Sequence, residues 1–438
     1  MNQDEDRSDT VTTDELAEWV REAAQRLTEL VSDLDDAQLR PPVLPIVNPL
    51  LWEIGHVTWF QEAFVLRGAL REPPLVERAD ALWDSAAIPH DTRWSLHLPS
   101  REEMHRYITD VTDRVIDGLW GPWSTRQLRY VTRYTVHHHD MHTEALTYTR
   151  QTLAYPPPTL STIETVDAEQ AGPLTGDADI PGGTFLLGAD RDTGFVHDNE
   201  KWAHPVQVEP FGLARAPVTQ AEYAAFVEDG GYRRRELWDV DGWEWRRHAA
   251  AEHPVYWQPG RAGWQRRDFD QWVPLEPDRP VSHVCWHEAT AYARWAGRRL
   301  PTEAEWEAAA LAEPDAAGGL KPHKRRFPWG DEPVTTGRAN LDWRHMGTAD
   351  VAAYPEGDSA FGCRQLLGNL WEWTASTFTA YPGFEQDVYR DNSVPSFGSR
   401  KVLRGGAWAT RARLAHGTIR NYFTPDRRDV LAGFRTAA

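Results

Sequence analysis

Hydrophobic positions in the first part of the chain recur at helical spacing. Thr12 and Glu15 have the spacing of a capping box, in which each residue caps a backbone N–H of a helix start. Apolar residues then follow three or four positions apart, which places them on one side of a helix. They are Leu16, Trp19, Val20, Ala23, Leu27, Leu30 and Val31. The pattern predicts an amphipathic helix that ends before the proline-rich residues 40–49.

Three more helices are predicted before residue 155. Residues 49–70 form a mostly apolar run opened by Pro49, which suits the first turn of a helix. The third helix begins at Ser100, and the fourth runs from about residue 124 to 153. The third carries its apolar stripe at Met104, Ile108, Val111, Val115 and Leu119. Four helices of this length predict an antiparallel bundle, a fold that commonly holds a metal between facing helices.

The pattern changes after the fourth helix. Residues 156–179 are rich in proline, threonine and acidic residues, which is typical of a linker. From residue 180 onward, short apolar segments alternate with Gly, Pro and Asp, and a helix is predicted to begin at Pro301 and Thr302. We therefore expect an α+β protein of two domains, a helical bundle over residues 1–155 and an irregular α+β domain over residues 180–438.

Composition narrows the classes of partner. Among 438 residues, 66 are acidic and 47 basic, a net charge of −19, which disfavours binding to nucleic acids and to anionic membranes. Two cysteines, Cys285 and Cys363, cannot build a disulfide framework or a thiolate zinc site. No apolar run reaches the roughly 20 residues of a membrane helix, and the polar start is unlike a signal peptide. We expect a cytoplasmic protein that acts on small molecules.

A cluster of histidines in the fourth predicted helix is the main candidate for chemistry. Residues 134–146, YTVHHHDMHTEAL, contain His137, His138, His139 and His142. Each residue of a helix turns by about 100°, so His138 and His142 differ by only about 40° and can bind one metal ion. Their face continues the inward stripe of the helix, through Leu128, Val131, Thr135 and Ala145.

The other polar residues of the cluster point elsewhere. His137 and His139 lie about 100° to either side of His138, and we predict that they are not ligands. A pair of His139 with His142 is the alternative, although its axis points less directly inward. Glu144 lies about 200° from His142, so it would support the site from outside or serve the fold.

The third ligand must come from another helix. His56 is a polar residue in the inward apolar series of the second predicted helix, within LLWEIGHVTWF. Three neutral imidazoles suit Zn, Fe or Cu and leave coordination positions open for a reaction. The alternative is that these histidines are surface residues or hydrogen-bonded core residues.

The motifs resemble a known family of two-domain enzymes. HHDMHTE and GHVTWF resemble the DinB-like helical domain of ergothioneine-type sulfoxide synthases. The second half resembles the C-type-lectin-like fold of formylglycine-generating and sulfatase-modifying enzymes, and the motifs together cover nearly the whole chain. They include IPGGTFLLG, GRRLPTEAEWEAAA, FPWG, GNLWEWTAS, VLRGGAWAT and the terminal GFR. Formylglycine-generating activity is not expected, because the cysteine pair of that family is missing.

The resemblance implies a metal and a substrate. The metal would be Fe(II), held by His56, His138 and His142. The substrate would be hercynine, the trimethylated betaine of histidine, whose imidazole C2 is joined to sulfur or selenium with the use of O2. An open metal face that gathers these partners would make the reaction one of positioning.

Two departures from the mycobacterial-type enzymes bear on the donor. In WEWTASTFTAYPGF, Phe378 stands where those enzymes carry the tyrosine that donates a proton, and only Tyr381 is retained. They also grip the carboxylates of γ-glutamylcysteine with two arginines. Here Arg93 matches the first, whereas Leu98 stands about where the second is expected. Together with the C-terminal segments SRKVLRGGAWATRARLAH and RNYFTPDRRDVLAGFRT, this favours the selenoneine synthase branch, whose donor is a neutral selenosugar.

The family resemblance also implies substrate contacts. They are expected at Arg93, Arg420, Asn421, Asp426 and Arg427, with Tyr381 and the position of Phe378 as the catalytic places. Trp371, Trp373 and Trp408 are expected in the core of the second domain. The sequence leaves open which tryptophans line the pocket, which acid replaces the missing tyrosine (Tyr422 is one candidate), the oxidation state of the product and the oligomeric state.

Three other functions are compatible with the sequence. The first is an ergothioneine-type synthase that uses γ-glutamylcysteine or cysteine. The second is a thiol dioxygenase or thiol transferase in which Phe378 reflects a different route of proton delivery. The third is not an enzyme but a lectin-like module that binds a small molecule, with a structural metal in the bundle.

Overall fold

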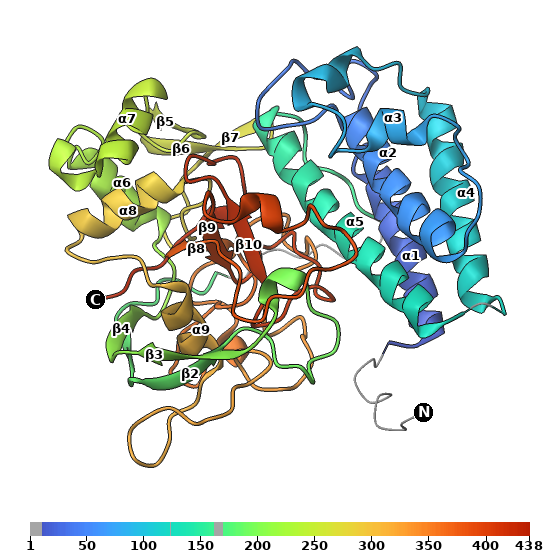
Figure 1. Ribbon diagram of the computed structural model, residues 1–438. Coiled ribbons are helices and arrows are strands. Elements are labelled where there is room, and N and C mark those ends of the chain that lie inside the picture. Colours follow the sequence, from blue (N-terminus) through green and yellow to red (C-terminus); the bar gives the residue numbers. More distant parts are fainter. Residues whose placement is uncertain (1–10, 123, 162–169) are drawn as a thin grey trace. The chain divides into compact units, whose positions relative to one another are not determined.

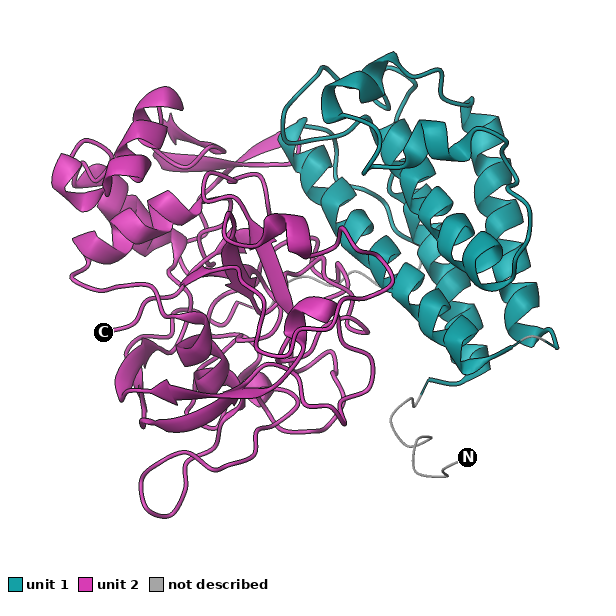
Figure 2. Cartoon of the chain, in the orientation of Figure 1, with its two compact units in different colours: residues 1–164 teal, residues 165–438 magenta. Residues whose placement is uncertain are grey.

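The chain folds into two compact units, residues 1–164 and 165–438 (Figure 2). The computed structural model describes residues 11–122, 124–161 and 170–438. Part of the predicted linker, residues 162–169, lies outside the described residues, so the predicted limits of the linker stay a prediction. None of the helices in the described ranges has the length and hydrophobicity needed to cross a bilayer.

Unit 1 is a bundle of long helices with short helical segments between them (Figure 1). The long helices pack pairwise, with α1 and α2 each against both α4 and α5. The elements are α1 (Thr13–Glu29), α2 (Leu50–Gln61), η2 (Glu62–Ala69), α3 (Ala79–Trp83), η3 (His90–Ser95), α4 (Arg101–Trp120) and α5 (Arg126–Thr152).

The helix starts follow from local sequence. Thr12 and Glu15 form the predicted capping box of α1, and Ser100 and Glu103 form another at α4. Thr125 caps α5 through its side chain, which accepts a hydrogen bond from the backbone N–H of Leu128. These caps satisfy backbone donors that a helix start otherwise leaves unpaired.

The second helix differs from the prediction in one respect. The run 49–70 is α-helical only through Gln61 and then widens into the π-helical segment η2. Every residue of α2 is buried, so this helix is enclosed on all sides by the rest of unit 1. It therefore places its polar side chains, Glu53 and His56 among them, inside the bundle.

Unit 2 contains small sheets joined by long loops and short helices. Its helices are α6 (Gln220–Glu228), α7 (Val240–His248), α8 (Trp286–Trp295) and α9 (Glu303–Leu311). The sheets follow the orders β1-β4, β2-β3, β5-β6-β7 and β10-β9-β8-β11. The strands are β1 (Asp177–Ile180), β2 (Gly183–Leu187), β3 (His204–Val208), β4 (Phe211–Ala214), β5 (Trp257–Gly260), β6 (Gly263–Asp268), β7 (Gln271–Pro274), β8 (Trp371–Thr377), β9 (Lys401–Arg404), β10 (Arg420–Phe423) and β11 (Ala432–Gly433).

The core of unit 2 is organised around α9. This helix begins after the N-cap Thr302, as predicted, and lies beside β2, β3, β8 and β9 (Figure 1). Its Trp306 is fully buried and donates a hydrogen bond to Glu372 on β8 at 2.8 Å. Cys285 and Cys363 are both buried and unbridged.

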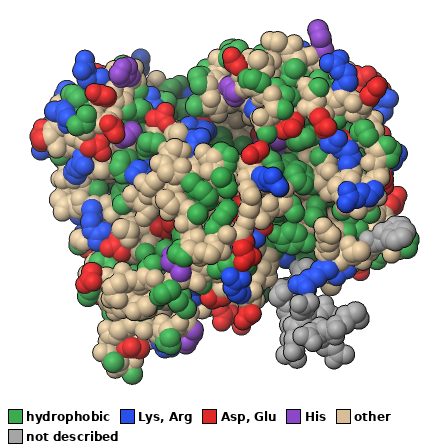
Figure 3. Space-filling view, viewed as in Figure 1, with side chains coloured by type: hydrophobic (Ala, Val, Ile, Leu, Met, Phe, Trp, Pro, Cys, Tyr) green, Lys and Arg blue, Asp and Glu red, His purple; other side chains and the backbone are tan. Residues whose placement is uncertain are grey.

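Charged side chains are mixed on the surface of both units. On the face drawn in Figure 3, acidic and basic side chains are interspersed, and no extended basic area is visible among the described residues.

Candidate metal centre

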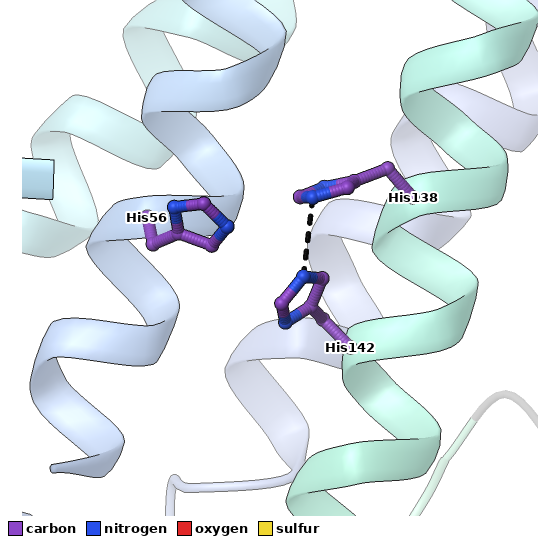
Figure 4. Close-up of side chains that lie close together, drawn as sticks. All are labelled: His56, His138 and His142. Carbon is purple, nitrogen blue, oxygen red and sulfur yellow. Dashed lines mark hydrogen bonds between the residues drawn. The ribbon is translucent and has the colours of Figure 1, made fainter. Parts of the chain in front are cut away.

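Three histidines of unit 1 meet between two helices. His56 comes from α2, and His138 and His142 come from successive turns of α5, with their rings turned into the same space (Figure 4). One ring nitrogen from each lies within 4.8 Å of the others. The Nε2 atoms of His138 and His142 are 3.1 Å apart. The structure thus brings together the three residues that the sequence selected.

Hydrogen bonds behind the rings fix which nitrogen faces the shared space. The Nδ1 of His56 lies 2.8 Å from the carbonyl oxygen of Trp83, which can only accept, so Nδ1 carries the proton and Nε2 keeps its lone pair. The Nδ1 of His142 donates in the same way to Oε1 of Glu53. A carboxylate behind a ligating imidazole is a common arrangement at metal sites, where it fixes the ring and raises its basicity.

Aromatic rings hold two of the imidazoles in place. The ring of Phe60 stacks on His138, with centroids 3.6 Å apart and planes 7° from parallel. The ring of Trp52 stacks on His56, with centroids 5.0 Å apart and planes 5° from parallel. The apolar positions around the site on α2 therefore orient the ligand candidates as well as fill the core.

The charge states suit a metal ligand set. Burial lowers the pKa of His56 to about 3, so this imidazole is neutral and able to bind a metal at neutral pH. Burial alone would raise the pKa of Glu53, but the neighbouring His142, which donates a hydrogen bond to its carboxylate, lowers it to about 2. Glu53 is therefore an ionised carboxylate beside the site.

These residues fit a first-row metal ion. Two imidazole nitrogens bound at about 2.1 Å lie about 3.0 to 3.4 Å apart for bond angles between a right angle and a tetrahedral one. The 3.1 Å between the Nε2 atoms of His138 and His142 falls in that range. Three imidazoles without a further ligand among the described residues would leave coordination positions for substrates.

The neighbouring histidines make other contacts. His137 accepts a hydrogen bond from Nε of Arg133 at 3.3 Å, and its ring meets Trp19 edge-on. His139 donates from Nδ1 to the carbonyl oxygen of Thr135 at 3.0 Å. Neither belongs to the group of histidines that could share an ion.

Glu53 is the residue of the site that the sequence analysis missed. It lies three positions before His56 on a helix that is otherwise almost entirely apolar. An acid at helical spacing from a predicted ligand, within a buried helix, would have been the signal that identifies it.

Arg93 lies close to the same site in unit 1. Its side chain is 9% exposed, and its guanidinium carbon lies 4.0 Å from the centroid of the Trp52 ring. It donates to Oδ1 of Asn48 at 2.7 Å and to the carbonyl oxygens of Ser85 and Ile88. The structure therefore places the predicted donor-binding arginine within a set of protein acceptors.

Arg420 of unit 2 is part of an internal ion-pair network. Its guanidinium donates to both carboxylate oxygens of Glu303, at 2.7 and 3.0 Å, and lies over the rings of Phe378 and Tyr381. Glu303 also pairs with the fully buried Arg404. In this arrangement Arg420 supports the interior of unit 2, and its role as a substrate contact stays a prediction.

The remaining predicted contacts lie on the C-terminal segment. Arg427 pairs with both carboxylate oxygens of Asp429 at 2.6 Å, whereas Asp426 is exposed. Asn421 is half-buried on β10, and its Oδ1 accepts from the backbone N–H of Tyr422. Of these side chains, Asp426 is the most accessible to a ligand.

The two positions assigned to catalysis are both buried. Phe378 stacks on Tyr422, with centroids 3.9 Å apart and planes 13° from parallel. Tyr381 lies between the ring of His204, 4.8 Å away, and the guanidinium of Arg420. Burial raises the pKa of Tyr381, and its hydroxyl has no hydrogen-bond partner among the described residues. This tyrosine is therefore protonated at neutral pH.

Comparison with known proteins gives the same division of the chain. The DinB superfamily matches residues 20–146, and the sulfatase-modifying factor enzyme 1-like domain matches residues 163–438. A formylglycine-generating enzyme of Thermomonospora curvata is 34% identical over 296 residues, which cover 59% of this chain and 92% of that protein. The predicted fold class, a helical domain followed by a formylglycine-generating-enzyme-like domain, is confirmed.

Two relatives match over nearly their whole length. A hercynine oxygenase of Mycolicibacterium thermoresistibile is 38% identical over 431 residues, covering 97% of this chain and 94% of that protein. A hercynine oxygenase of Mycolicibacterium smegmatis is 35% identical over 436 residues, covering 98% and 99%. The chain therefore belongs to the ergothioneine and selenoneine synthase family, which includes these hercynine oxygenases.

Proposed function

We propose that this protein is an iron-dependent oxidoreductase that acts on hercynine with O2. The observation that carries the proposal is the set of three imidazole nitrogens within 4.8 Å, in a chain of this family. Fe(II) held by His56, His138 and His142 would supply the redox chemistry with O2 that the reaction needs. The residues of the chain provide the binding and orientation.

We further propose that the bond formed at imidazole C2 of hercynine is to selenium, taken from a selenosugar. The C2–H and Se–H bonds would be replaced by one C–Se bond, and the sugar would stay on selenium. The two electrons and two protons released would reduce O2 to H2O2, or O2 would transfer one oxygen atom to selenium and leave the other as water. Phe378 supports this choice, because the side chain at the position of the family's proton donor has no hydroxyl. Leu98, about where a second arginine would grip a peptide donor, supports it as well.

The residues around the iron candidate have separate roles in this scheme. Glu53 orients His142, and the carbonyl of Trp83 orients His56, so that both Nε2 lone pairs face the ion. Phe60 and Trp52 exclude water from one side of the ligand rings. The protonated Tyr381 cannot act as a base at neutral pH.

The donor is tested by supplying one candidate at a time. Fe(II)-loaded protein is mixed with hercynine, O2 and either a selenosugar, γ-glutamylcysteine or cysteine, and products are identified by mass spectrometry. We expect a selenium-containing product of hercynine with the selenosugar. Product with γ-glutamylcysteine or cysteine alone would instead assign the ergothioneine-type reaction.

The three successive histidines of α5 offer a matched control. His138→Gln should abolish product, whereas His139→Gln, which alters a neighbouring buried imidazole outside the group, should retain it. Hercynine that is not consumed by the wild-type protein with any donor would favour the binding-module alternative.

A further inference from the structure

We propose that Arg93 is a positioning residue of the three-histidine site and does not hold a carboxylate of the donor. The first half of this inference depends only on unit 1. The second half rests on the proposed function, because it concerns the donor of that reaction.

The guanidinium of Arg93 already has partners within the protein. Its Nη1 donates to Oδ1 of Asn48 at 2.7 Å, and its Nη2 donates to the carbonyl oxygens of Ser85 and Ile88 at 3.3 and 3.2 Å. The residue is 9% exposed. A donor carboxylate would have to displace these acceptors and leave partly buried carbonyl groups without this donor, which is unfavourable.

One connection to the site runs through Asn48. Because its Oδ1 accepts from Arg93, its amide Nδ2 must face the other way, and it donates to Oε2 of Glu53 at 2.6 Å. The other oxygen of Glu53 accepts from Nδ1 of His142. Arg93 therefore sets the orientation of an amide that holds the carboxylate behind one ligand candidate.

A second connection runs through an aromatic ring. The guanidinium carbon of Arg93 lies 4.0 Å from the centroid of the Trp52 ring, and Trp52 also stacks with His56, with ring centroids 5.0 Å apart. Trp52 is itself held by a hydrogen bond from Nε1 to the carbonyl oxygen of Leu82 at 2.7 Å. Arg93, Trp52 and His56 thus contact in series.

The two connections reach different ligands. Asn48 and Glu53 lead to His142 on α5, whereas Trp52 leads to His56 on α2. One arginine therefore supports ligands from both helices that form the site.

The consequence for the donor concerns its charge. Arg93 already donates hydrogen bonds to Asn48 and to two backbone carbonyl groups. It therefore lacks the two adjacent available N–H groups that bidentate binding of a carboxylate requires. Leu98 provides no charge at the second position. The group of the donor that would face this region is therefore neutral, as in a sugar.

The inference is tested by metal affinity, with Co(II) as the probe. Competition with a chromophoric chelator and the visible absorption spectrum of the bound ion are measured for the wild type, Arg93→Gln and Asn48→Ala. We expect each variant to weaken Co(II) binding by about tenfold or more and to alter the spectrum, as loss of outer partners of metal ligands does. The double variant should lose little more than Arg93→Gln alone, because the connection through Asn48 already depends on Arg93.

The matched control is another buried arginine of unit 1. Arg150 is fully buried and donates to Asp33 and to the carbonyl oxygens of Leu30 and Pro156. Arg150→Lys should lower the unfolding temperature and leave Co(II) affinity unchanged, whereas Arg93→Lys should weaken affinity. Asn48→Ala keeps the test valid if a change at Arg93 impairs folding.

The outcomes separate this inference from the proposed function. Wild-type protein that binds no Co(II) would overturn the metal centre and the function with it. Wild-type affinity in both Arg93→Gln and Asn48→Ala would overturn only the positioning role. An Arg93→Gln protein with unchanged Co(II) affinity but a raised KM for γ-glutamylcysteine would assign Arg93 to the donor instead.

Discussion

Gly55 lies so close to Trp83 that a Cβ atom at this position would be 2.0 Å from Nε1 of the indole. The carbonyl oxygen of the same tryptophan accepts the hydrogen bond from Nδ1 of His56. The absent side chain of one residue therefore permits the contact that orients its neighbour as a metal ligand.

Gly55→Ala should weaken both the fold and the metal site. The methyl group must displace the fully buried Trp83, and overpacking of this kind costs about 1–3 kcal/mol of the free energy of unfolding. Movement of Trp83 also withdraws the acceptor of His56, so Co(II) affinity should fall. Chemical denaturation and chelator competition measure the two effects.

Gly118→Ala in α4 is the control for that substitution. Its Cβ would meet the end of the Leu70 side chain at 2.6 Å, a group that can move to another rotamer. We expect little change in stability and none in metal affinity. Equal losses of metal affinity in the two variants would contradict the role given to Trp83.

Glu53→Gln should reduce metal affinity without unfolding the bundle. The amide is similar in size but removes the negative charge behind His142, and loss of such a partner typically lowers affinity about 10- to 100-fold. Glu62→Gln is the matched control, because Glu62 is a buried acid on the adjoining segment that accepts from Tyr107 instead of a ligand. Unchanged Co(II) affinity in Glu53→Gln would count against the arrangement.

Glu200 should make unit 2 sensitive to acid. Burial alone would raise the pKa of Glu200, but the charge of His416 and its hydrogen bond lower it to about 2. The pKa of a glutamate in the unfolded chain is about 4.3, so the ionised Glu200 stabilises the fold above about pH 4.3. This stabilisation is lost as the pH falls toward 2, the pKa in the folded state.

The comparison is between the wild type and Glu200→Gln. The wild type should have the higher unfolding temperature at neutral pH, and the difference should shrink between about pH 5 and pH 2. Exposed Glu209→Gln should show no such difference. A gap between wild type and Glu200→Gln that stays constant over this range would rule out the proposed linkage.

Arg420→Gln should act on stability more than on substrate binding. The change leaves the buried Glu303 with Arg404 as its remaining arginine partner, and breaking a buried ion pair costs about 3–5 kcal/mol. Arg191→Gln, in an exposed pair with Glu385, should cost no more than about 1 kcal/mol. A raised donor KM with unchanged stability would restore Arg420 to the role that the sequence analysis expected.

The sequence predicts those parts of the molecule that depend on local patterns. Capping boxes and apolar spacing locate the long helices of unit 1, because both act within one or two turns. His138 and His142 follow from helical geometry within α5. His56 required the further assumption that α2 faces α5, which is a tertiary relationship.

The contacts behind the ligands could not be predicted in this way. Trp83, Asn48 and Arg93 come from α3, from the loop before α2 and from η3, and the positions of these short segments are set by packing and carry no periodic pattern. The start of the π-helical segment η2 likewise has no distinctive spacing of apolar residues that would have predicted it. The local motif of Arg93 also does not reveal its hydrogen-bond partners, and its predicted role as a substrate contact stays a prediction.

The most direct test of the account is the consumption of hercynine by protein loaded anaerobically with Fe(II), followed after O2 is admitted. The wild type should bind iron in a constant molar ratio to the protein chain. It should consume hercynine only when iron, O2 and a donor are all present. His56→Gln, His138→Gln and His142→Gln should lose iron and activity together, whereas His139→Gln keeps both. Hercynine consumption that survives in the His138→Gln protein, or proceeds without iron, would contradict the central claim.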